Sequence, residues 1–484
     1  MPGITLLGLG PGNPDQLTRE AWDVLSASDE IWLRTRQHPT VSALPSSLTT
    51  HSFDDLYENG DSFDQVYDAI VEKVLELGRR PQGVIYAVPG HPFMAETTCP
   101  KINRLARDEG LTATIIAGIS FLEPTFSSLG IDPYPRITLF DAMELSMAHV
   151  PAFPPDIPVL VAQLYSRLVA SEVKMTLNTA YPDEHPVRLA HAAGTKDELV
   201  EDLKLYEIDR SEHIGLLTSL YVPSLGEGTS FEAFQEIVAH LRAPDGCPWD
   251  REQTHQSLRT HLLEETYEAL EAIDAEDVDG MEEEFGDLLL QIVLHAQIAN
   301  EESDFTINNL IKNIYDKIVR RHPHVFGELA LNEVDGVLQN WEKLKETERK
   351  TKGKEKENGL LDGVPLALPA LTQAQEYQDR AARLGFDWPV VDGVLEKVAE
   401  EIQEIKKATN EDELADEIGD LFFVLVNLAR WKKIDAESAL RGTNFKFKRR
   451  FAYVEQRAKN QGHSLSDMTL EEMDALWEES KGKE

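Results

Sequence analysis

Cysteine is scarce in this chain of 484 residues, where only Cys99 and Cys247 occur. Two cysteines do not support a disulfide framework or a cysteine-based zinc site, so we expect a reducing, cytoplasmic location. Positive charge is scarce too, because 47 Lys and Arg stand against 86 Asp and Glu, a formal net charge of −39. Such a chain is not expected to bind a nucleic-acid polymer, which needs a basic surface.

Long apolar runs are also missing. No segment approaches the roughly 20 apolar residues that span a bilayer, so no membrane partner is expected. The N-terminal MPGITLLGLGPG lacks a basic region before its apolar run and does not resemble a signal peptide. With 42% apolar and 27% charged residues the composition is globular. The length predicts about two to four domains.

The first stretch, 1–222, alternates short apolar runs with helical patterns such as Thr18 to Ser28 and Phe63 to Leu77. Strands that alternate with helices predict an α/β layer with a largely parallel sheet. The expected buried strands are 4–10, 83–90, 113–120 and 157–163.

From residue 231 onward, a helical periodicity rich in Glu, Leu and Ala predicts all-α structure. The lysine-rich segment 345–360 interrupts this pattern and is expected to be an exposed linker between two helical domains, 231–344 and 361–484. Each domain holds a Glu-Glu-x-x-Glu helix followed by a Glu-x-Gly-Asp helix, which indicates an internal duplication.

Helical phase distinguishes these carboxylates from a solvated Glu-rich face, which is the alternative interpretation. Residues three apart lie about 60° apart on a helix, and this places Glu265 and Glu268 at the border of an apolar stripe. The other three pairs have the same phase, so four carboxylates in each half are expected to converge. They would raise one another's pKa unless a cation joins them, and oxygen ligands select Mg²⁺ or Mn²⁺. The expected metal ligands are Glu265, Glu268, Glu284 and Asp287, and Glu401, Glu404, Glu417 and Asp420.

A glycine, Gly286 or Gly419, precedes the aspartate of each half. Glycine costs about 1 kcal/mol in a helix relative to alanine. Close approach of another backbone would explain both glycines, although each could simply be tolerated.

Both halves resemble MazG-type nucleoside triphosphate pyrophosphohydrolases, all-α enzymes with an EExxE…ExxD metal motif. The resemblance covers about 231–484 and implies Mg²⁺-dependent release of pyrophosphate from nucleoside triphosphates, by a water that the metal activates. It also implies a homodimer in which two protomers complete each helical bundle. The segments that resemble the family are 241–268, 320–328, 340–345, 361–371, 383–388 and 444–451.

Other residues of the two halves have more open roles. Glu264 and Glu400 lie further from the apolar stripe, where they either orient the attacking water or are solvated. Basic residues are expected to bind the leaving pyrophosphate, the alternative being surface charge. His322 and His324 are interpreted as helix-end residues, whereas Trp249, Trp341 and Phe386 either stack on a base or pack in a core. The basic candidates are Lys446, Lys448, Arg449 and Arg450 in the second half, and Lys312, Arg320 and Arg321 in the first. The basic segment NFKFKRRF (444–451) slightly favours the second half as the catalytic one.

The N-terminal stretch begins with GLGPGNPDQLT (8–18), a Gly-rich turn between a strand and a helix, where backbone N–H groups can approach a ligand. This turn, VPGHPFMAE (88–96) and IIAGISFLEP (115–124) resemble three motifs of the tetrapyrrole (corrin/porphyrin) methylases, which bind S-adenosylmethionine between two α/β lobes. The resemblance implies ten cofactor contacts: Gly8, Gly10, Pro11, Gly12, Gly90, His91, Pro92, Gly118, Ile119 and Ser120.

One position departs from the methylase pattern, because many members have Asp where this chain has His91. The methyl acceptor is not indicated by the sequence, and a domain that binds the cofactor without transferring its methyl group stays open. The main alternative function is an S-adenosylmethionine-dependent methyltransferase whose helical half serves mainly for dimerisation. A purely structural helical adaptor would leave eight phased carboxylates without a reason.

Overall fold

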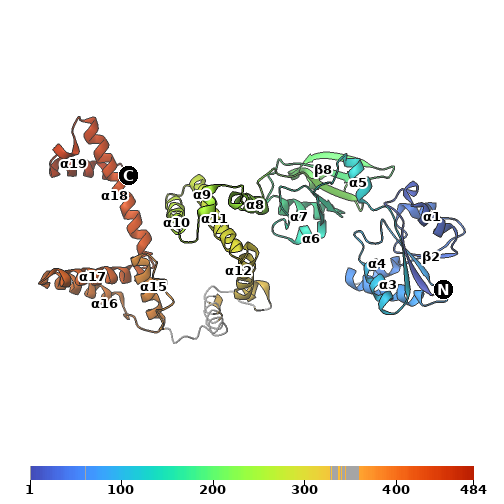
Figure 1. Ribbon diagram of the computed structural model, residues 1–484, viewed down its shortest axis with the longest axis horizontal. Helices are drawn as coiled ribbons and strands as arrows, with labels where there is room; N and C mark the ends of the chain where they lie inside the picture. Colours follow the sequence, from blue (N-terminus) through green and yellow to red (C-terminus); the bar gives the residue numbers. More distant parts are fainter. Residues whose placement is uncertain are drawn as a thin grey trace. The chain divides into compact units, whose positions relative to one another are not determined.

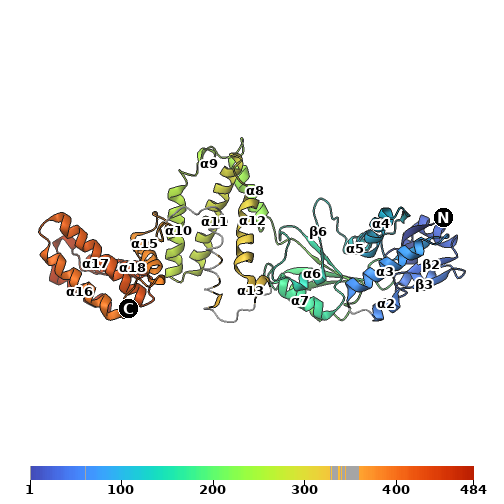
Figure 2. The same ribbon diagram turned by 90° about the horizontal axis from the view of Figure 1, so that it is seen from below.

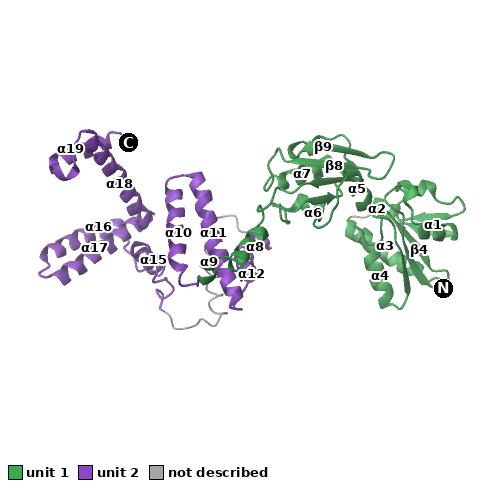
Figure 3. Ribbon diagram, turned by 45° about the horizontal axis from the view of Figure 1, so that its top comes forward, with its two compact units in different colours: residues 1–252 green, residues 253–484 purple. Residues whose placement is uncertain are grey.

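The computed structural model describes residues 2–59, 62–327 and 359–483, with a few isolated positions between 329 and 344. It divides into two compact units, 1–252 and 253–484 (Figure 3). Trp341 and most of the expected linker 345–360 lie outside the described residues. The finer domain boundaries expected at 222 and 231 stay a prediction.

The first sheet of unit 1 is entirely parallel, in the order β3-β2-β4-β1-β5. Ile4 and Leu6 of β1 pack on α3 and α4, whereas Leu7 and Leu9 pack on α1, so both faces of the sheet are buried. The order of strands and helices in this lobe confirms the predicted alternation. The strands are β1 Gly3–Gly8, β2 Glu30–Leu33, β3 Thr49–Ser52, β4 Val84–Val88 and β5 Thr112–Ile116. The helices are η1 Pro14–Gln16, α1 Arg19–Ser26, η2 Pro39–Ala43, α2 Asp54–Asn59, α3 Phe63–Gly78 and α4 Thr98–Asp108.

The second sheet of unit 1 has the order β6-β7-β10-β8-β9, and only β6 and β7 run parallel in it. The prediction of a largely parallel sheet is therefore wrong for this lobe. One reason is the connection between β8 and β9, which consists only of residues 192–198. Strands joined by so short a connection pair antiparallel, because a parallel crossover needs a dozen or more residues. The strands are β6 Thr138–Asp141, β7 Val159–Ala162, β8 Pro186–His191, β9 Leu199–Lys204 and β10 Thr218–Val222. The helices are α5 Leu122–Leu129, α6 Ala142–Met147, α7 Arg167–Leu177 and η3 Leu205–Arg210, followed by α8 Phe231–Arg242 and α9 Pro248–Glu252.

Unit 2 is helical in both halves, as predicted. The long pairs α10–α11 and α16–α17 are helical hairpins (Figures 1 and 2), and their second helices begin at the side-chain caps Asp277 and Asn410. The first half contains α10 Arg259–Asp274, α11 Val278–Glu301, α12 Ile307–Arg321 and α13 Pro323–Phe326. The second contains α15 Ala370–Arg383, α16 Val391–Lys407, α17 Glu411–Trp431, α18 Ala436–Asn460, η4 Leu465–Asp467 and α19 Leu470–Lys481.

The hairpins of unit 2 leave large apolar side chains exposed, among them Leu263 and Phe285 in the first and Phe422, 56% exposed, in the second. Gly286 and Gly419 also face open space, because a Cβ added to either would meet nothing within 4 Å. The close backbone approach expected at these glycines is therefore not made within the described part of this chain. Among the described residues, we find no helix with the length and apolarity to cross a membrane.

Candidate functional site

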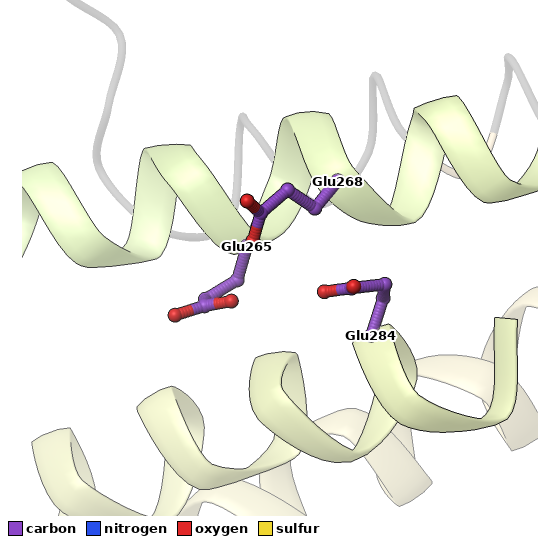
Figure 4. Close-up of side chains that lie close together, drawn as sticks. All are labelled: Glu265, Glu268 and Glu284. Atoms are coloured by element: carbon purple, nitrogen blue, oxygen red, sulfur yellow. The ribbon is translucent and has the colours of Figure 1, made fainter. Parts of the chain in front are cut away.

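Three of the predicted ligands in the first half converge between α10 and α11. Glu265 and Glu268 come from one helix and Glu284 from the helix that faces it (Figure 4). One oxygen of each lies within 4.8 Å of the other two. Opposite ligands of an octahedral Mg²⁺ lie about 4.2 Å apart, so small side-chain rotations bring these oxygens into range.

The second half repeats the arrangement with Glu401 of α16 and Glu417 and Asp420 of α17, whose oxygens meet the same limit. The remaining predicted ligands, Asp287 and Glu404, lie outside these two sets of three. The charge of Asp287 still raises the pKa of Glu265 and Glu284, and the charge of Glu404 raises that of Glu417.

The electrostatics of both clusters favour a bound cation. Desolvation, followed by the charges of Asp287, Glu268 and Glu284, raises the pKa of Glu265. Desolvation and neighbouring carboxylates likewise raise the pKa of Glu284 and of Glu417. Among the described residues, one buried oxygen of Glu284 and one of Glu401 have no hydrogen-bond partner. Uncompensated oxygens among like charges fit a hard divalent ion, so these residues suit Mg²⁺.

A lysine that sequence reasoning missed distinguishes the second cluster. Lys397 places its Nζ 2.7 Å from Glu401 and 3.0 Å from Glu400, and Glu401 is only 2% exposed. The equivalent position of the first half, four residues before Glu265, is His261, whose ring lies 3.3 Å from Glu264. The i, i+3 and i, i+4 spacing of these pairs is the signal that would have found them.

Replacing Lys397 by Met should tighten divalent binding at the second cluster, because the metal then displaces no internal cation. Exposed ion pairs contribute about 0.2–1 kcal/mol, and this pair belongs at the upper end of that range because Glu401 is buried, so we expect about a fivefold lower Kd. Mn²⁺ titration of a protein that also carries Glu265→Ala and Glu268→Ala measures the Kd of the second cluster alone. Lys406→Met on the same helix is the control. Weaker Mn²⁺ binding in the Lys397 variant would mean that the lysine organises the carboxylates instead.

The predicted basic residues of the second half lie on α18, which leads away from the α16–α17 hairpin (Figure 1). Arg450 covers the ring of Trp477 in α19, and Phe447 packs on the same ring. Lys446 and Lys448 are exposed, and Arg449 lies on the same helix. These contacts of Arg450 and Phe447 join α18 to α19.

The remaining predicted residues of unit 2 have the following positions. Lys312 pairs with Asp316 on α12, and Arg320 and Arg321 form the last turn of that helix. His322 is the C-cap of α12 and donates to the carbonyl of Ile318, as a helix-end residue should. His324 follows in α13. Trp249 is exposed in α9, and Phe386 is 85% exposed, so core packing does not explain Phe386 within this chain.

In unit 1 a cavity of about 270 Å³ lies at the carboxyl ends of the first sheet's strands, and Pro11, Gly90 and His91 line it. These are three of the ten predicted cofactor contacts. Gly90 has a φ of +67° and open space where a Cβ would lie. A backbone surface that only glycine leaves open fits a cofactor such as S-adenosylmethionine.

Other predicted contacts hold the turn together. A Cβ on Gly8 or Gly118 would lie 2.5 Å or 2.2 Å from the carbonyl oxygen of Gly90, so these glycines allow three strand ends to pack. Gly10 exchanges backbone hydrogen bonds with Gly90, and Gly12 has a φ of +132°. Ser120 donates a hydrogen bond to Glu123 and is buried. Pro92 is also buried, and Ile119 is half-buried.

His91, the position that departs from the methylase pattern, makes a side-chain contact within its own turn. Its Nδ1 accepts a hydrogen bond from the backbone N–H of Phe93 at 3.0 Å. An aspartate carboxylate makes the same two-residue turn contact. The sequence missed Arg34 and Glu96, which also line the cavity and form a buried ion pair.

Comparison with known proteins agrees with this geometry. The family model of the MazG nucleotide pyrophosphohydrolase domain matches residues 253–326 and 390–454. That of the tetrapyrrole (corrin/porphyrin) methylases matches residues 3–209. The chain thus belongs to the MazG family, with two MazG domains that follow a tetrapyrrole methylase domain.

Particular relatives match the whole chain or its second part. The uncharacterized protein YabN of Bacillus subtilis is 44% identical over 99% of both chains. The nucleoside triphosphate pyrophosphohydrolase/pyrophosphatase MazG of Thermotoga maritima is 45% identical, over 53% of this chain and 97% of its own. The nucleoside triphosphate pyrophosphohydrolase of Escherichia coli K12 is 43% identical over 51% and 95%. A uroporphyrin-III-C-methyltransferase structure from Thermus thermophilus covers 46% of this chain and 94% of its own, at 20% identity and a TM-score of 0.38.

Proposed function

We propose that unit 2 hydrolyses nucleoside triphosphates to the monophosphate and pyrophosphate with Mg²⁺. The observation that carries the proposal is the duplicated carboxylate cluster. Its raised pKa values, and its buried oxygens without hydrogen-bond partners among the described residues, are what a bound cation would compensate. The relatives from T. maritima and E. coli, which are named nucleoside triphosphate pyrophosphohydrolases, support it.

The residues divide the work as follows. The four predicted ligands of each half would hold a divalent ion, which would supply charge neutralisation for the phosphate oxygens and activation of water. Glu264 and Glu400, each beside a basic side chain, would take up a proton from the attacking water. The basic residues of α18 then bind the leaving pyrophosphate, which requires that α18 of one protomer reach a carboxylate cluster of another.

A pyrophosphate-release assay over the common triphosphates, with Mg²⁺ and with a chelator, tests the proposal. We expect release only with the metal. If no triphosphate yields pyrophosphate with Mg²⁺ present, the alternative of a methyltransferase with a dimerising helical half is favoured.

Magnesium should also stabilise unit 2 in a pH-dependent way. Glu265, Glu284 and Glu417 have raised pKa values in the folded chain, so their favourable contribution is complete below about pH 4.5 and is lost as the pH rises through the raised values. Mg²⁺ at a hundredfold excess over its Kd should raise Tm by about 5–10 °C near pH 7.5 and have little effect near pH 4.5. Thermal melts at both pH values measure this. Equal Mg²⁺ effects at the two values would contradict it.

We also infer a homodimer. A second protomer would bury the exposed apolar side chains of both hairpins and pack against the open faces of Gly286 and Gly419. Phe422→Glu should convert a dimer of about twice 54.4 kDa into the monomer. Light scattering measures the mass, and Leu366→Glu, which changes a residue 85% exposed outside the hairpins, is the control. A monomeric wild-type chain would overturn this inference.

For unit 1 we propose S-adenosylmethionine as ligand of the cavity beside Gly90, and a cytoplasmic location fits the two unbridged cysteines. Isothermal titration of the full chain with S-adenosylmethionine tests the cofactor, and the absence of binding heat would remove it.

A further inference from the structure

A second cavity of unit 1, of about 560 Å³, adjoins the first. Both are lined by His38, Pro89, Leu216, Leu217 and Thr218, so these residues mark where the two spaces meet. Only His38 and Thr218 bring polar side chains to this junction. The sequence pattern predicted a functional role for neither residue.

His38 offers an unused acceptor at the junction. It is 7% exposed, and its Nδ1 has no hydrogen-bond partner among the described residues. Burial lowers its pKa to about 4, although a hydrogen bond to the backbone of Gly10 opposes the shift. The ring is therefore neutral near pH 7 and presents a bare lone pair. A buried lone pair of this kind suits a ligand that donates an N–H or O–H.

Thr218 begins a series of side-chain hydrogen bonds across three strands, and its Oγ1 also accepts a hydrogen bond from the backbone N–H of Gly215 at 2.9 Å. Its Oγ1 lies 3.1 Å from Nδ1 of His191, the residue directly opposite in the β8–β10 register. Nε2 of His191 lies 2.8 Å from Glu201 of β9, which also accepts from Ser211 at 2.5 Å. His191 is 4% exposed and Thr218 only 2%.

The hydrogen bonds from Thr218 through His191 to Glu201 have one consistent order of donors and acceptors. Burial alone would raise the pKa of Glu201, but the hydrogen bonds from Ser211 and His191 keep it below its usual value, so the carboxylate is ionised. Burial lowers the pKa of His191 even though Glu201 opposes this. A neutral His191 then donates from Nε2 to Glu201, which leaves Nδ1 to accept the hydroxyl proton of Thr218. The other titratable groups near His191 are His213, whose ring lies 5.8 Å away, and Asp197 in the cavity wall.

We propose that the junction is a proton-accepting site for a methyl acceptor with an N–H or O–H group, in which Thr218 passes the acceptor's proton to His191. The proposal rests on S-adenosylmethionine binding, as proposed above. The acceptor's N–H or O–H bond breaks while its nitrogen or oxygen bonds to the methyl carbon, and the sulfonium bond breaks to leave a thioether. The proton moves through the Thr218 hydroxyl to Nδ1 of His191, and Glu201 stabilises the imidazolium that forms.

The division of roles between the two histidines follows from their partners. His38 is backed by a neutral backbone carbonyl, so it orients the acceptor through a hydrogen bond. His191 is backed by a carboxylate, which favours a protonated ring as it forms. Thr218 touches the acceptor, and His191 and Glu201 act through it as positioning residues.

Nitrogen-15 NMR of histidine side chains in the full chain, without cofactor, tests the relay itself. We expect a neutral His191 with its proton on Nε2 near pH 7.5, and a changed tautomer or a lower pKa in Glu201→Gln. A proton on Nδ1 of His191 in the wild type would overturn the proposal, because Thr218 could not then donate to it.

Transfer of a labelled methyl group from S-adenosylmethionine to water and to added imidazole, as O–H and N–H probes, tests the chemistry. Thr218→Val should slow transfer about 100-fold at unchanged cofactor Kd, whereas Thr218→Ser restores it. Equal rates in the wild type and the Val variant, or no transfer by a cofactor-bound wild type, would overturn the relay. If the wild type does not bind S-adenosylmethionine, the cofactor assignment is rejected instead, and the NMR result still decides the relay.

Discussion

Replacing Glu401 and Glu404 by Ala should lower pyrophosphate release by more than about 100-fold, well beyond the effect of the matching change at Glu265 and Glu268. Loss of residues that merely support metal ligands costs about 10–100-fold, and loss of ligands should cost more. The preference for the second half rests on the basic residues of α18, which belong to that half. Steady-state pyrophosphate release with Mg²⁺ measures both variants.

The structure also supplies an argument against this preference. Lys397 already neutralises part of the second cluster, whereas the first cluster has no lysine at the equivalent position. If that internal cation excludes the metal, the Glu265 and Glu268 variant will lose more activity, and equal losses will mean that both halves turn over substrate. Glu411→Ala with Asp412→Ala, at the start of α17 and outside the cluster, is the matched control for loss of two acidic residues.

The sequence predicts those features of the fold that repeat along the chain. Helical phase placed Glu265, Glu284, Glu401 and Glu417 at helix–helix borders, and the structure brings each pair together. Buried strands were recognised where the residues are continuously apolar, as in β1 and β4. Strands β8 to β10 were missed because their apolar runs are short. Arg188 and Glu201 lie inside β8 and β9, and β10 begins with two polar residues. The polar residues His191, Glu201 and Thr218 join across this sheet.

Contacts between distant residues account for most of what could not be predicted. Thr218 and His191 meet only because β10 pairs with β8 in one register, and no spacing along the chain indicates this. The Arg34 and Glu96 ion pair likewise joins the ends of two segments 62 residues apart in sequence. The Gly-rich motifs were correctly placed after strands, but their glycines serve two purposes. Gly90 faces open space, whereas Gly8 and Gly118 face backbone.

Gly118→Ala should therefore destabilise unit 1 by about 3 kcal/mol or more, through backbone crowding. The added Cβ would lie 2.2 Å from the carbonyl oxygen of Gly90 and 2.8 Å from the carbonyl carbon of Gly8, and neither backbone can move without shifting a strand end. For a unit of this size such a change lowers Tm by about 6–12 °C. Thermal unfolding of the full chain, followed by the near-ultraviolet signal of unit 1, measures the shift.

Gly215→Ala provides the control, because Gly215 lies in the same unit and a Cβ there meets nothing within 4 Å. Its Tm should stay within about 2 °C of the wild type. The comparison separates the two roles that a glycine motif can have. If Gly118→Ala keeps the wild-type Tm and loses only S-adenosylmethionine binding, Gly118 contacts the cofactor directly and the packing explanation is wrong. If Tm falls while the folded fraction binds the cofactor normally, the motif's glycines divide into those that close the sheet edge and Gly90, which opens it to the ligand.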